Sequence, residues 1–420
     1  MSKETYCQRV DHELILRSFN ESIEAALCCK AQNPINLYPK NENIEDVKTA
    51  LSNGIKHKHC SVCWQHEKQG IKSWRQIGND INYHNRNDLE LYLDNTCDLA
   101  CIYCSKKYSS KWQQEIGNAL PEDKDLLNRL LNDNENFVPS NKKINHVERM
   151  LNEVTIFGHR TTQTRDRAQI MLLGGEPLLA PYIKKNVIHD IVDSFYKHGN
   201  SEHPLKIVIV TNGNSPDHII DKTISTMYEL SKVYKNIEWS IALSMESIGK
   251  TAEAIRFGLD YNQFIKNYKK YLSTPFQVGF NLTINTISFN STPQFVEEMF
   301  ALAKQHNKEI YFRFNVCLFP KYLSVRMVSK SNLYIIDDIR KVIEKYKTQI
   351  YTPHQFLGMI DSDLNNLESY IDTEENKKEC ASAGLQYFDY LKRARSTDIS
   401  EVAKDVFDYY MELFEVKHAG

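Results

Sequence analysis

One run of cysteines constrains this chain more than any other feature. Cys97, Cys101 and Cys104 follow one another in the spacing C-x3-C-x2-C, and no further cysteine lies near them in sequence. Iron–sulfur clusters are held by cysteine thiolates, and three thiolates on one loop can bind three irons of a four-iron cluster. The fourth iron is then open to a small molecule, like the open position of a catalytic metal site. The sequence therefore predicts a [4Fe-4S] cluster with one open iron.

The length and composition narrow the class of protein. A chain of 420 residues can form a barrel-sized domain with one or two smaller parts. Eight of its ten cysteines precede residue 105, and its first residues lack the apolar run of a signal peptide. We therefore expect a soluble, cytoplasmic protein whose cysteines serve metal or redox chemistry and form no disulfide framework. No apolar run approaches the roughly 20 residues that span a bilayer, and a net charge of −2 gives no reason to expect a nucleic-acid partner.

The first 86 residues contain a second group of cysteines. They are Cys7, the adjacent pair Cys28 and Cys29, and the C-x2-C of Cys60 and Cys63, which we expect on two turns and a short hairpin. Four thiolates from this set could bind either a structural zinc ion or a second iron–sulfur cluster, and the spacing leaves both open. Buried thiols without a ligand role are a third reading. Neighbouring residues of an extended segment point in opposite directions, so we expect one member of the pair to face the metal and favour Cys28.

The central segment predicts repeated βα units. Apolar strand-like runs alternate with helical stretches, a pattern typical of a parallel sheet. We expect strands at residues 89–94, 169–173, 205–210, 237–243, 277–285 and 309–316, and helices at 107–117, 122–132, 182–198, 216–234, 260–272 and 292–306. A polar loop is expected at 132–143. Six such units indicate a partial, open barrel.

The polar and glycine-rich motifs come directly after these strands. The three-cysteine loop follows the first strand, Gly174-Gly-Glu-Pro follows the second, and Thr-Asn212-Gly follows the third. Ser244-Met-Glu246 follows the fourth. Loops at the carboxyl ends of parallel strands converge on one edge of a sheet or barrel. We therefore expect these motifs to act together.

Two of these motifs carry a resemblance. The cysteine loop, with the aromatic Tyr103 before its last cysteine, resembles the signature of radical S-adenosylmethionine (SAM) enzymes. Gly174-Gly175-Glu176 resembles the GGE motif of the same superfamily. The resemblance covers roughly residues 88–320. It implies a partial (βα)6 TIM-like barrel of the radical SAM type, bound SAM, and reductive cleavage of SAM to a 5′-deoxyadenosyl radical that abstracts hydrogen from a substrate.

The N-terminal cysteines extend the resemblance. Their order, followed by Trp64, Glu67, Gly70, Ser73 and Arg75, is similar to the auxiliary-cluster module of twitch-domain (SPASM-like) radical SAM proteins. This implies a second, auxiliary [4Fe-4S] cluster on Cys7, Cys28, Cys60 and Cys63. Relatives carry a glycine shortly before the first cysteine of the pair, but this chain has none at residues 21–27, so the choice between Cys28 and Cys29 stays open.

The resemblance also implies a set of SAM-binding residues. Glu176 would accept hydrogen bonds from the SAM amino group, with Gly174 and Gly175 allowing the backbone to approach. Ser244 and Glu246 would bind the ribose, and Arg256 would bind the carboxylate. Tyr103 would lie near the adenine, and Asn212 is a further candidate. The alternatives are a carboxylate at a helix start for Glu176, a helix N-cap for Ser244, a surface arginine for Arg256, packing for Tyr103 and a plain turn for Asn212.

The remainder of the chain is expected to be mostly helical. Amphipathic patterns at 335–347 and 401–414 predict helices that could cap the open side of the barrel. Cys317, after the sixth strand, is expected to be a buried core thiol. The predicted parts are an N-terminal iron–sulfur module at 1–86, the barrel at 87–320 and a helical extension at 321–420.

The sequence therefore favours a radical SAM enzyme acting on a peptide or small metabolite. An electron donor such as flavodoxin or ferredoxin would supply the reducing electron. The alternatives are a non-catalytic zinc or iron–sulfur protein, and a radical SAM enzyme that modifies nucleic acid or nucleotides. The last of these would need a basic cleft.

Overall fold

The structure is a computed structural model that describes residues 5–19, 22–28, 31, 35–38, 43–68, 70, 73–80, 86–131, 144–164, 167–180 and 187–415. Cys29 and the expected polar loop at 132–143 lie outside the described residues. The chain divides into two compact units. Unit 1 contains Met1–Thr96, Asn136–Ile209 and Asp221–Ser240, and unit 2 contains Cys97–Glu135, Val210–Ile220 and Ile241–Gly420.

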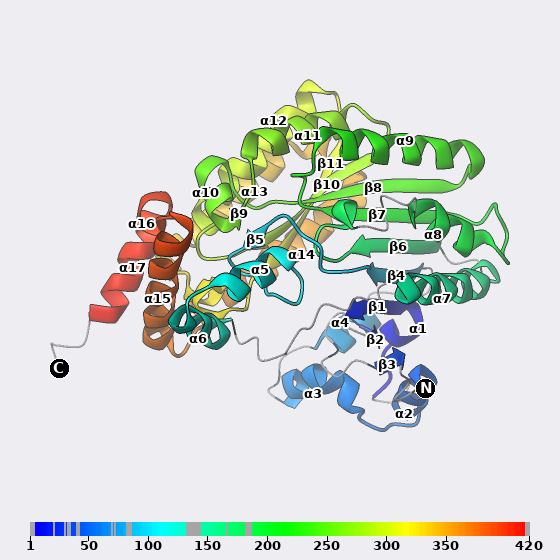
Figure 1. The fold of residues 1–420 in the computed structure, drawn as a ribbon, viewed down its shortest axis with the longest axis horizontal. Coiled ribbons are helices and arrows are strands. Elements are labelled where there is room, and N and C mark those ends of the chain that lie inside the picture. Colours follow the sequence, from blue (N-terminus) through cyan, green and yellow to red (C-terminus); the bar gives the residue numbers. More distant parts are fainter. Residues whose placement is uncertain are drawn as a thin grey trace. The chain divides into compact units, whose positions relative to one another are not determined.

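Unit 1 is built on a mixed sheet with the strand order β8-β7-β6-β4-β1-β2-β3 (Figure 1). The pairs β1–β4, β4–β6 and β6–β7 are parallel, whereas β1–β2 and β2–β3 are antiparallel. The N-terminal segment thus shares a sheet with the first barrel strand. The strands are β1 (Glu13–Phe19), β2 (Ser22–Ala26), β3 (Ile35–Tyr38), β4 (Arg86–Tyr92), β6 (Arg167–Leu173), β7 (Leu205–Thr211) and β8 (Ile237–Ser244).

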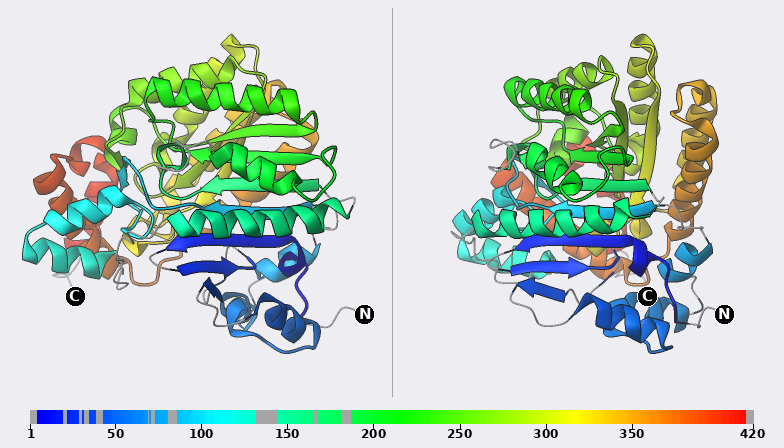
Figure 2. Two further views of the ribbon diagram at one scale, coloured as in Figure 1. Left: turned by 45° about the vertical axis from the view of Figure 1, so that its right-hand side comes forward. Right: turned by 90° about the vertical axis from the view of Figure 1, so that its right-hand side faces the viewer.

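Helices cover this sheet in unit 1. The long helix α7 packs along α8 and also contacts β4 and β6 (Figure 2). The Asn43 side chain caps helix α2, and Val47 and Leu51 on this helix are buried. The helices are α1 (Arg9–His12), α2 (Ile44–Ser52), α3 (Ser61–Lys68), α4 (Trp74–Asp80), α7 (Ile144–Thr162), α8 (Val187–Tyr196) and most of α9 (Asp217–Val233).

The strands of unit 2 follow the order β11-β10-β8-β7. Of β7 and β8, only the last residues belong to this unit. Strands β10 and β11 are parallel, and α14 packs on β11. A separate two-stranded ribbon joins β5 to β9. The strands are β5 (Ala100–Cys101), β9 (Arg256–Phe257), β10 (Gln277–Ile284) and β11 (Ile310–Val316).

The helices of unit 2 include the C-terminal group that the sequence predicts. Helix α15 packs against α6 and α17, and Figure 1 draws α15, α16 and α17 side by side. The helices are α5 (Ser110–Asn118), α6 (Pro121–Leu130), α10 (Gly249–Ile255), α11 (Tyr261–Leu272), α12 (Thr292–Gln305), α13 (Tyr334–Lys345), α14 (Pro353–Tyr370), α15 (Lys377–Arg395), α16 (Ile399–Val402) and α17 (Lys404–Glu415).

The expected α/β class is confirmed. The six strands expected for a partial (βα)6 barrel are β4, β6, β7, β8, β10 and β11. Residues 207–209 of β7 and 239–243 of β8 are buried without interruption, as is typical of parallel strands covered on both faces. No helix in the described part of the chain is long and apolar enough to cross a membrane.

Candidate functional site

The three cysteines of the C-x3-C-x2-C loop lie in unit 2, shortly after the end of β4. Cys101 is buried, and Cys97 and Cys104 are half-buried. Cys101 pairs with Arg256 in the short β5–β9 ribbon, and the amide of Ile102 donates to the carbonyl of Ile255 at 2.8 Å. The loop is thereby fixed to the segment that follows β8. No disulfide joins any of the nine cysteines that the structure describes.

Three of the predicted site residues form one buried cluster in unit 2. Arg256 Nη2 donates to Glu246 Oε2 at 2.5 Å, and the Tyr103 hydroxyl donates to Glu246 Oε1 at 3.2 Å. The guanidinium lies 5.7 Å from the centre of the Tyr103 ring. The side chains of Glu246 and Arg256 are only 1% and 5% exposed. The alternative of a solvated surface Arg256 is therefore wrong.

Arg256 also faces the cysteine loop. Its Nη1 lies 3.9 Å from the sulfur of Cys101. Its Nε is buried and has no hydrogen-bond partner among the described residues. Because a buried donor without a partner is costly, this atom indicates a ligand with an acceptor at this position.

The electrostatics favour a charged arginine beside the thiols. Burial lowers the pKa of Arg256, but the neighbouring Glu246 carboxylate raises it by more. The net pKa is therefore raised, and the guanidinium stays charged. Burial raises the pKa of the Cys101 thiol and Arg256 lowers it. Burial also raises the pKa of Tyr103 well above its usual value, so its hydroxyl remains a donor. These side chains thus present the fixed positive charge of Arg256 to any anion bound at the cysteine loop.

Asn212 joins the cysteine loop to the turn after β7. Its side-chain amide donates to Asp98 Oδ1 at 2.8 Å, and that of Asn214 donates to Asp98 Oδ2 at 2.8 Å. Gly213 between them has φ +73°, which favours glycine. The turn therefore orients Asp98, a residue that the sequence analysis does not single out. The repeated amides of Asn-Gly-Asn are the signal that could have indicated it.

Ser244 is the last residue of β8 and is half-buried. Helix α10 begins at Gly249 with Ile248 as its N-cap, so Ser244 is not the helix cap that the alternative reading proposed.

The glycine–glutamate motif lies in unit 1 and follows β6. The amides of Gly175 and Glu176 donate to the carbonyls of Asp94 and Thr96 at 3.1 and 2.6 Å. A Cβ atom on Gly175 would lie 2.3 Å from the Thr96 oxygen, and one on Gly174 would lie 2.6 Å from the Asp94 oxygen. Both glycines are thus required by the close approach of residues 94–96. Glu176 is buried, and one of its oxygens accepts from the Leu178 amide at 3.1 Å, which caps a short 3-10 turn (Pro177–Leu179).

The donor set of the cysteine loop fits a [4Fe-4S] cluster with one open iron. It offers three thiols on one segment, a neighbouring guanidinium and a buried N–H without a partner in the described residues. Among those residues, no three His, Cys, Asp or Glu side chains converge closely enough to share a single metal ion.

The second cysteine group lies in unit 1. Cys7, Cys60 and Cys63 are close enough to interact electrostatically, and burial raises the pKa of Cys7 to about 11 and that of Cys60 to about 12. The amide of Leu27, beside Cys28, donates to His59 Nε2 at 3.1 Å. The four predicted ligands therefore come from neighbouring segments.

Hydrogen-bond donors surround two of these sulfurs. The backbone amides of Arg9 and Val10 lower the pKa of Cys7 by hydrogen bonding to it, although burial raises it more. The backbone amide of Arg75 acts on Cys63 in the same way. Hydrogen bonds to cysteine sulfurs are one means by which proteins tune iron–sulfur clusters.

The side chains that follow the N-terminal cysteines in the resembling motif contact one another. Ser73 Oγ and Arg75 Nε donate to Glu67 Oε1 at 2.5 and 3.0 Å, and Arg75 lies 5.1 Å from the centre of the Trp64 ring.

The secondary structure of the C-x2-C differs from the expectation. Cys60 ends a short 3-10 helix (Lys58–Cys60) and Cys63 lies in α3, so the prediction of a turn or hairpin there is wrong. The His57 side chain accepts from the amide of His59 and starts this helical segment.

Cys317 directly follows β11 and is buried, as expected. Its sulfur donates to the carbonyl of Phe319 at 3.1 Å.

Comparison with known proteins gives only distant likenesses. No family model and no curated protein matches the chain. Among solved structures, anSMEcpe with bound AdoMet is 16% identical, with a TM-score of 0.39. The match covers 62% of this chain and 60% of anSMEcpe, so the chain spans less than two thirds of that protein. SuiB from Streptococcus suis is 11% identical, with a TM-score of 0.37 over 79% of this chain and 68% of SuiB.

Proposed function

We propose that this chain is a radical SAM enzyme with two [4Fe-4S] clusters. The observation that carries the proposal is the cysteine loop itself, with the Tyr103–Glu246–Arg256 cluster directly beside it. Three thiols leave one iron without a protein ligand, and the adjacent cation suits the carboxylate of an amino acid bound there. The likenesses to solved structures are too distant to add to this.

The cofactors would supply the radical chemistry. When bound, a four-iron cluster and SAM supply reductive cleavage of SAM to a 5′-deoxyadenosyl radical that abstracts hydrogen from the substrate. Cys97, Cys101 and Cys104 would hold the cluster. The task of the other residues is to bind and orient SAM.

Arg256 is the proposed carboxylate ligand. Its Nη2 is held by Glu246, so the fork is fixed in orientation while Nε keeps an unused donor. A carboxylate at this position would satisfy that donor at a fixed cation. Glu246 already accepts one hydrogen bond from Arg256 and one from Tyr103. Each carboxylate oxygen has a second lone pair, so a ribose hydroxyl could donate to Glu246 as well as bind Ser244.

Glu176 is the proposed acceptor for the SAM amino group. One carboxylate oxygen caps the turn after β6 and holds the side chain in place. Gly174 and Gly175 bring this turn against residues 94–96, the segment that leads into the cysteine loop. Tyr103 near the adenine and Asn212 are the remaining proposed SAM contacts.

The second cluster is proposed on Cys7, Cys28, Cys60 and Cys63. The amide donors at Cys7 and Cys63 favour a cluster with thiolate ligands there. Four ligands leave no open iron, which suits electron transfer from a donor such as flavodoxin or ferredoxin. The proposed substrate is a peptide or small metabolite. The proposed domains are an iron–sulfur module at residues 1–86, the barrel at 87–320 and a helical extension at 321–420.

Product analysis tests the activity. Anaerobically reconstituted protein is mixed with dithionite and SAM, and 5′-deoxyadenosine is measured by liquid chromatography. The wild type should form 5′-deoxyadenosine, and C101A should form none. A wild type that carries iron at both sites but never cleaves SAM would contradict the proposal and support the non-catalytic metal protein.

A further inference from the structure

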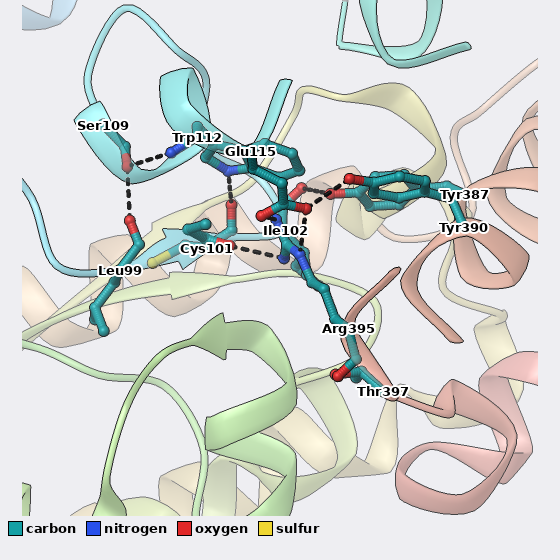
Figure 3. A network of polar contacts seen from close by, with 11 residues as sticks. Leu99, Cys101, Ile102, Ser109, Trp112, Glu115, Tyr387, Tyr390, Arg395 and Thr397 are labelled. Atoms are coloured by element: carbon teal, nitrogen blue, oxygen red, sulfur yellow. Dashed lines mark hydrogen bonds and ion pairs between the residues drawn. The ribbon is translucent and has the colours of Figure 1, made fainter. Parts of the chain in front are cut away.

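Four consecutive backbone carbonyls of the cysteine loop accept hydrogen bonds from side chains (Figure 3). The distances are between 2.6 and 3.0 Å. The pairs are Leu99 with Ser109 Oγ, Ala100 with Arg395 Nη1, Cys101 with Trp112 Nε1 and Ile102 with the Tyr387 hydroxyl. The segment that contains Cys101 is therefore held by side chains at every carbonyl.

Two of these donors come from helix α15, in the C-terminal group of helices. Tyr387 and Arg395 stand 285 and 295 residues from their acceptors in sequence. Both are buried, and the Arg395 side chain is only 1% exposed. The helix thus reaches the backbone on both sides of Cys101.

The charge of Arg395 is fully compensated within unit 2. Its Nε and Nη2 donate to the two oxygens of Glu115 at 2.8 and 2.9 Å, and the Tyr390 hydroxyl donates to Glu115 at 2.6 Å. The guanidinium lies 4.2 Å from the Trp112 ring centre and 4.6 Å from that of Phe257. Figure 3 shows the guanidinium between the Glu115 carboxylate and the loop.

This arrangement makes the loop conformation sensitive to α15. A buried guanidinium is tolerated only when it is paired and hydrogen-bonded, and removing one partner leaves the others unsatisfied. Moving the carbonyls of residues 100–102 would break the Arg395 and Tyr387 bonds together. The loop and the helix are therefore stable only in this mutual position.

We infer that Arg395 and Tyr387 are positioning residues that hold the Cys101 segment of the cluster loop in its ligand-presenting conformation. Helix α15 is thus part of the proposed cluster site, in addition to any role in closing the barrel. The inference rests on the proposed function for its purpose, since it assigns these residues to the loop that would carry the cluster.

Labelling of the metal-free protein tests the inference without a cluster. The rate at which Cys101 reacts with N-ethylmaleimide is measured by peptide mass spectrometry. Because Cys101 is buried, loosening the loop should speed its labelling. We expect an increase of about fivefold in Y387F, which removes one hydrogen bond, and of about a hundredfold in R395M, which removes two bonds to Glu115 and leaves this carboxylate without its cation.

R393M provides the matched control. Arg393 lies on the same helix and pairs with Asp123 and Asp389, but its side chain is 49% exposed. Labelling of Cys101 in R393M should stay within twofold of the wild type. Cys317, buried in the same unit, reports on general unfolding and should label at the wild-type rate in Y387F and R395M. Equal acceleration of Cys101 and Cys317, or no acceleration of Cys101 in Y387F, would overturn the inference.

Iron release from reconstituted protein gives the second readout. Y387F should lose iron to a chelator about fivefold faster than R393M. A wild type that binds no iron would defeat the proposed function, while the labelling result would still decide the positioning role. A wild type that binds iron, with Y387F and R393M losing it at equal rates, would defeat the inference alone.

Discussion

At the residue scale, the buried pair of Arg256 and Glu246 links the cysteine loop to the segment after β8. Both side chains are almost fully excluded from solvent, and Tyr103 is bonded to the same carboxylate. Isolated buried charges are very unfavourable, so each of these groups depends on the other. The pair is therefore both a structural element and the proposed anion site.

Replacing Arg256 should cost far more stability than replacing an exposed arginine. R256M leaves the Glu246 carboxylate buried without its cation, and we expect a loss of about 3–5 kcal/mol in the free energy of unfolding. The measurement is urea unfolding of metal-free protein followed by circular dichroism.

R340M is the control for this prediction. Arg340 pairs with Glu368 at 2.8 Å on the surface, with side chains 36% and 45% exposed, so its loss should cost less than about 1 kcal/mol. The double variant E246Q/R256M should be less destabilised than the sum of the two single variants. Equal losses in R256M and R340M would show that the pair is not buried as described.

Cys317 should be unreactive in the folded protein. Burial raises its pKa to about 12, and only the thiolate is nucleophilic. At pH 8 we expect labelling by iodoacetamide to be about a thousandfold slower in the native protein than in urea. Because the folded state holds the thiol proton more tightly, this group also disfavours folding as the pH rises above about 8.5. Similar labelling rates in native and unfolded protein would contradict the assignment.

At the element scale, the turn after β6 shows why a motif can be read from sequence. Gly174 and Gly175 pass so close to the carbonyls of Asp94 and Thr96 that no side chain fits at either position. The strands were predictable for a related reason, since residues such as 207–209 form apolar runs that are buried on both faces. Local chemistry thus determines both features.

G175A should destabilise the turn. The added methyl group would lie 2.3 Å from the Thr96 oxygen, so the turn and residues 94–96 must move apart, at a cost of about 1–3 kcal/mol. G358A in α14 meets no atom within 4 Å and should stabilise the protein by about 0.5–1 kcal/mol. Thermal unfolding of the two variants should therefore shift in opposite directions. A G175A protein as stable as the wild type would contradict the close approach.

Other elements were not predictable from local sequence. The C-x2-C segment spans the end of a 3-10 helix and the start of α3, although its short spacing and lack of helical periodicity favour a turn. Its helical start depends on the His57 side chain, a contact that sequence spacing does not indicate. Helix α5 begins at Ser110, later than expected, because Ser109 accepts from the Trp112 amide as its cap.

At the scale of the whole molecule, the two cysteine groups belong to different units of the chain. Tyr103, Glu246 and Arg256 could be nominated from sequence because their positions match the family pattern that the cysteine loop resembles. Arg395 and Tyr387 could not, because their contribution is a hydrogen bond to a backbone carbonyl nearly 300 residues away. Such a contact has no local pattern, and only the fold reveals it.

The iron and acid-labile sulfide content of anaerobically purified protein tests the central claim most directly. Two [4Fe-4S] clusters predict about eight irons per wild-type chain. The triple variant C97A/C101A/C104A should retain about four, and C60A/C63A should also retain about four. About four irons in the wild type and none in the triple variant would exclude the second cluster. That result would favour a zinc ion on the N-terminal cysteines. A triple variant with as much iron as the wild type would contradict the assignment of the cysteine loop.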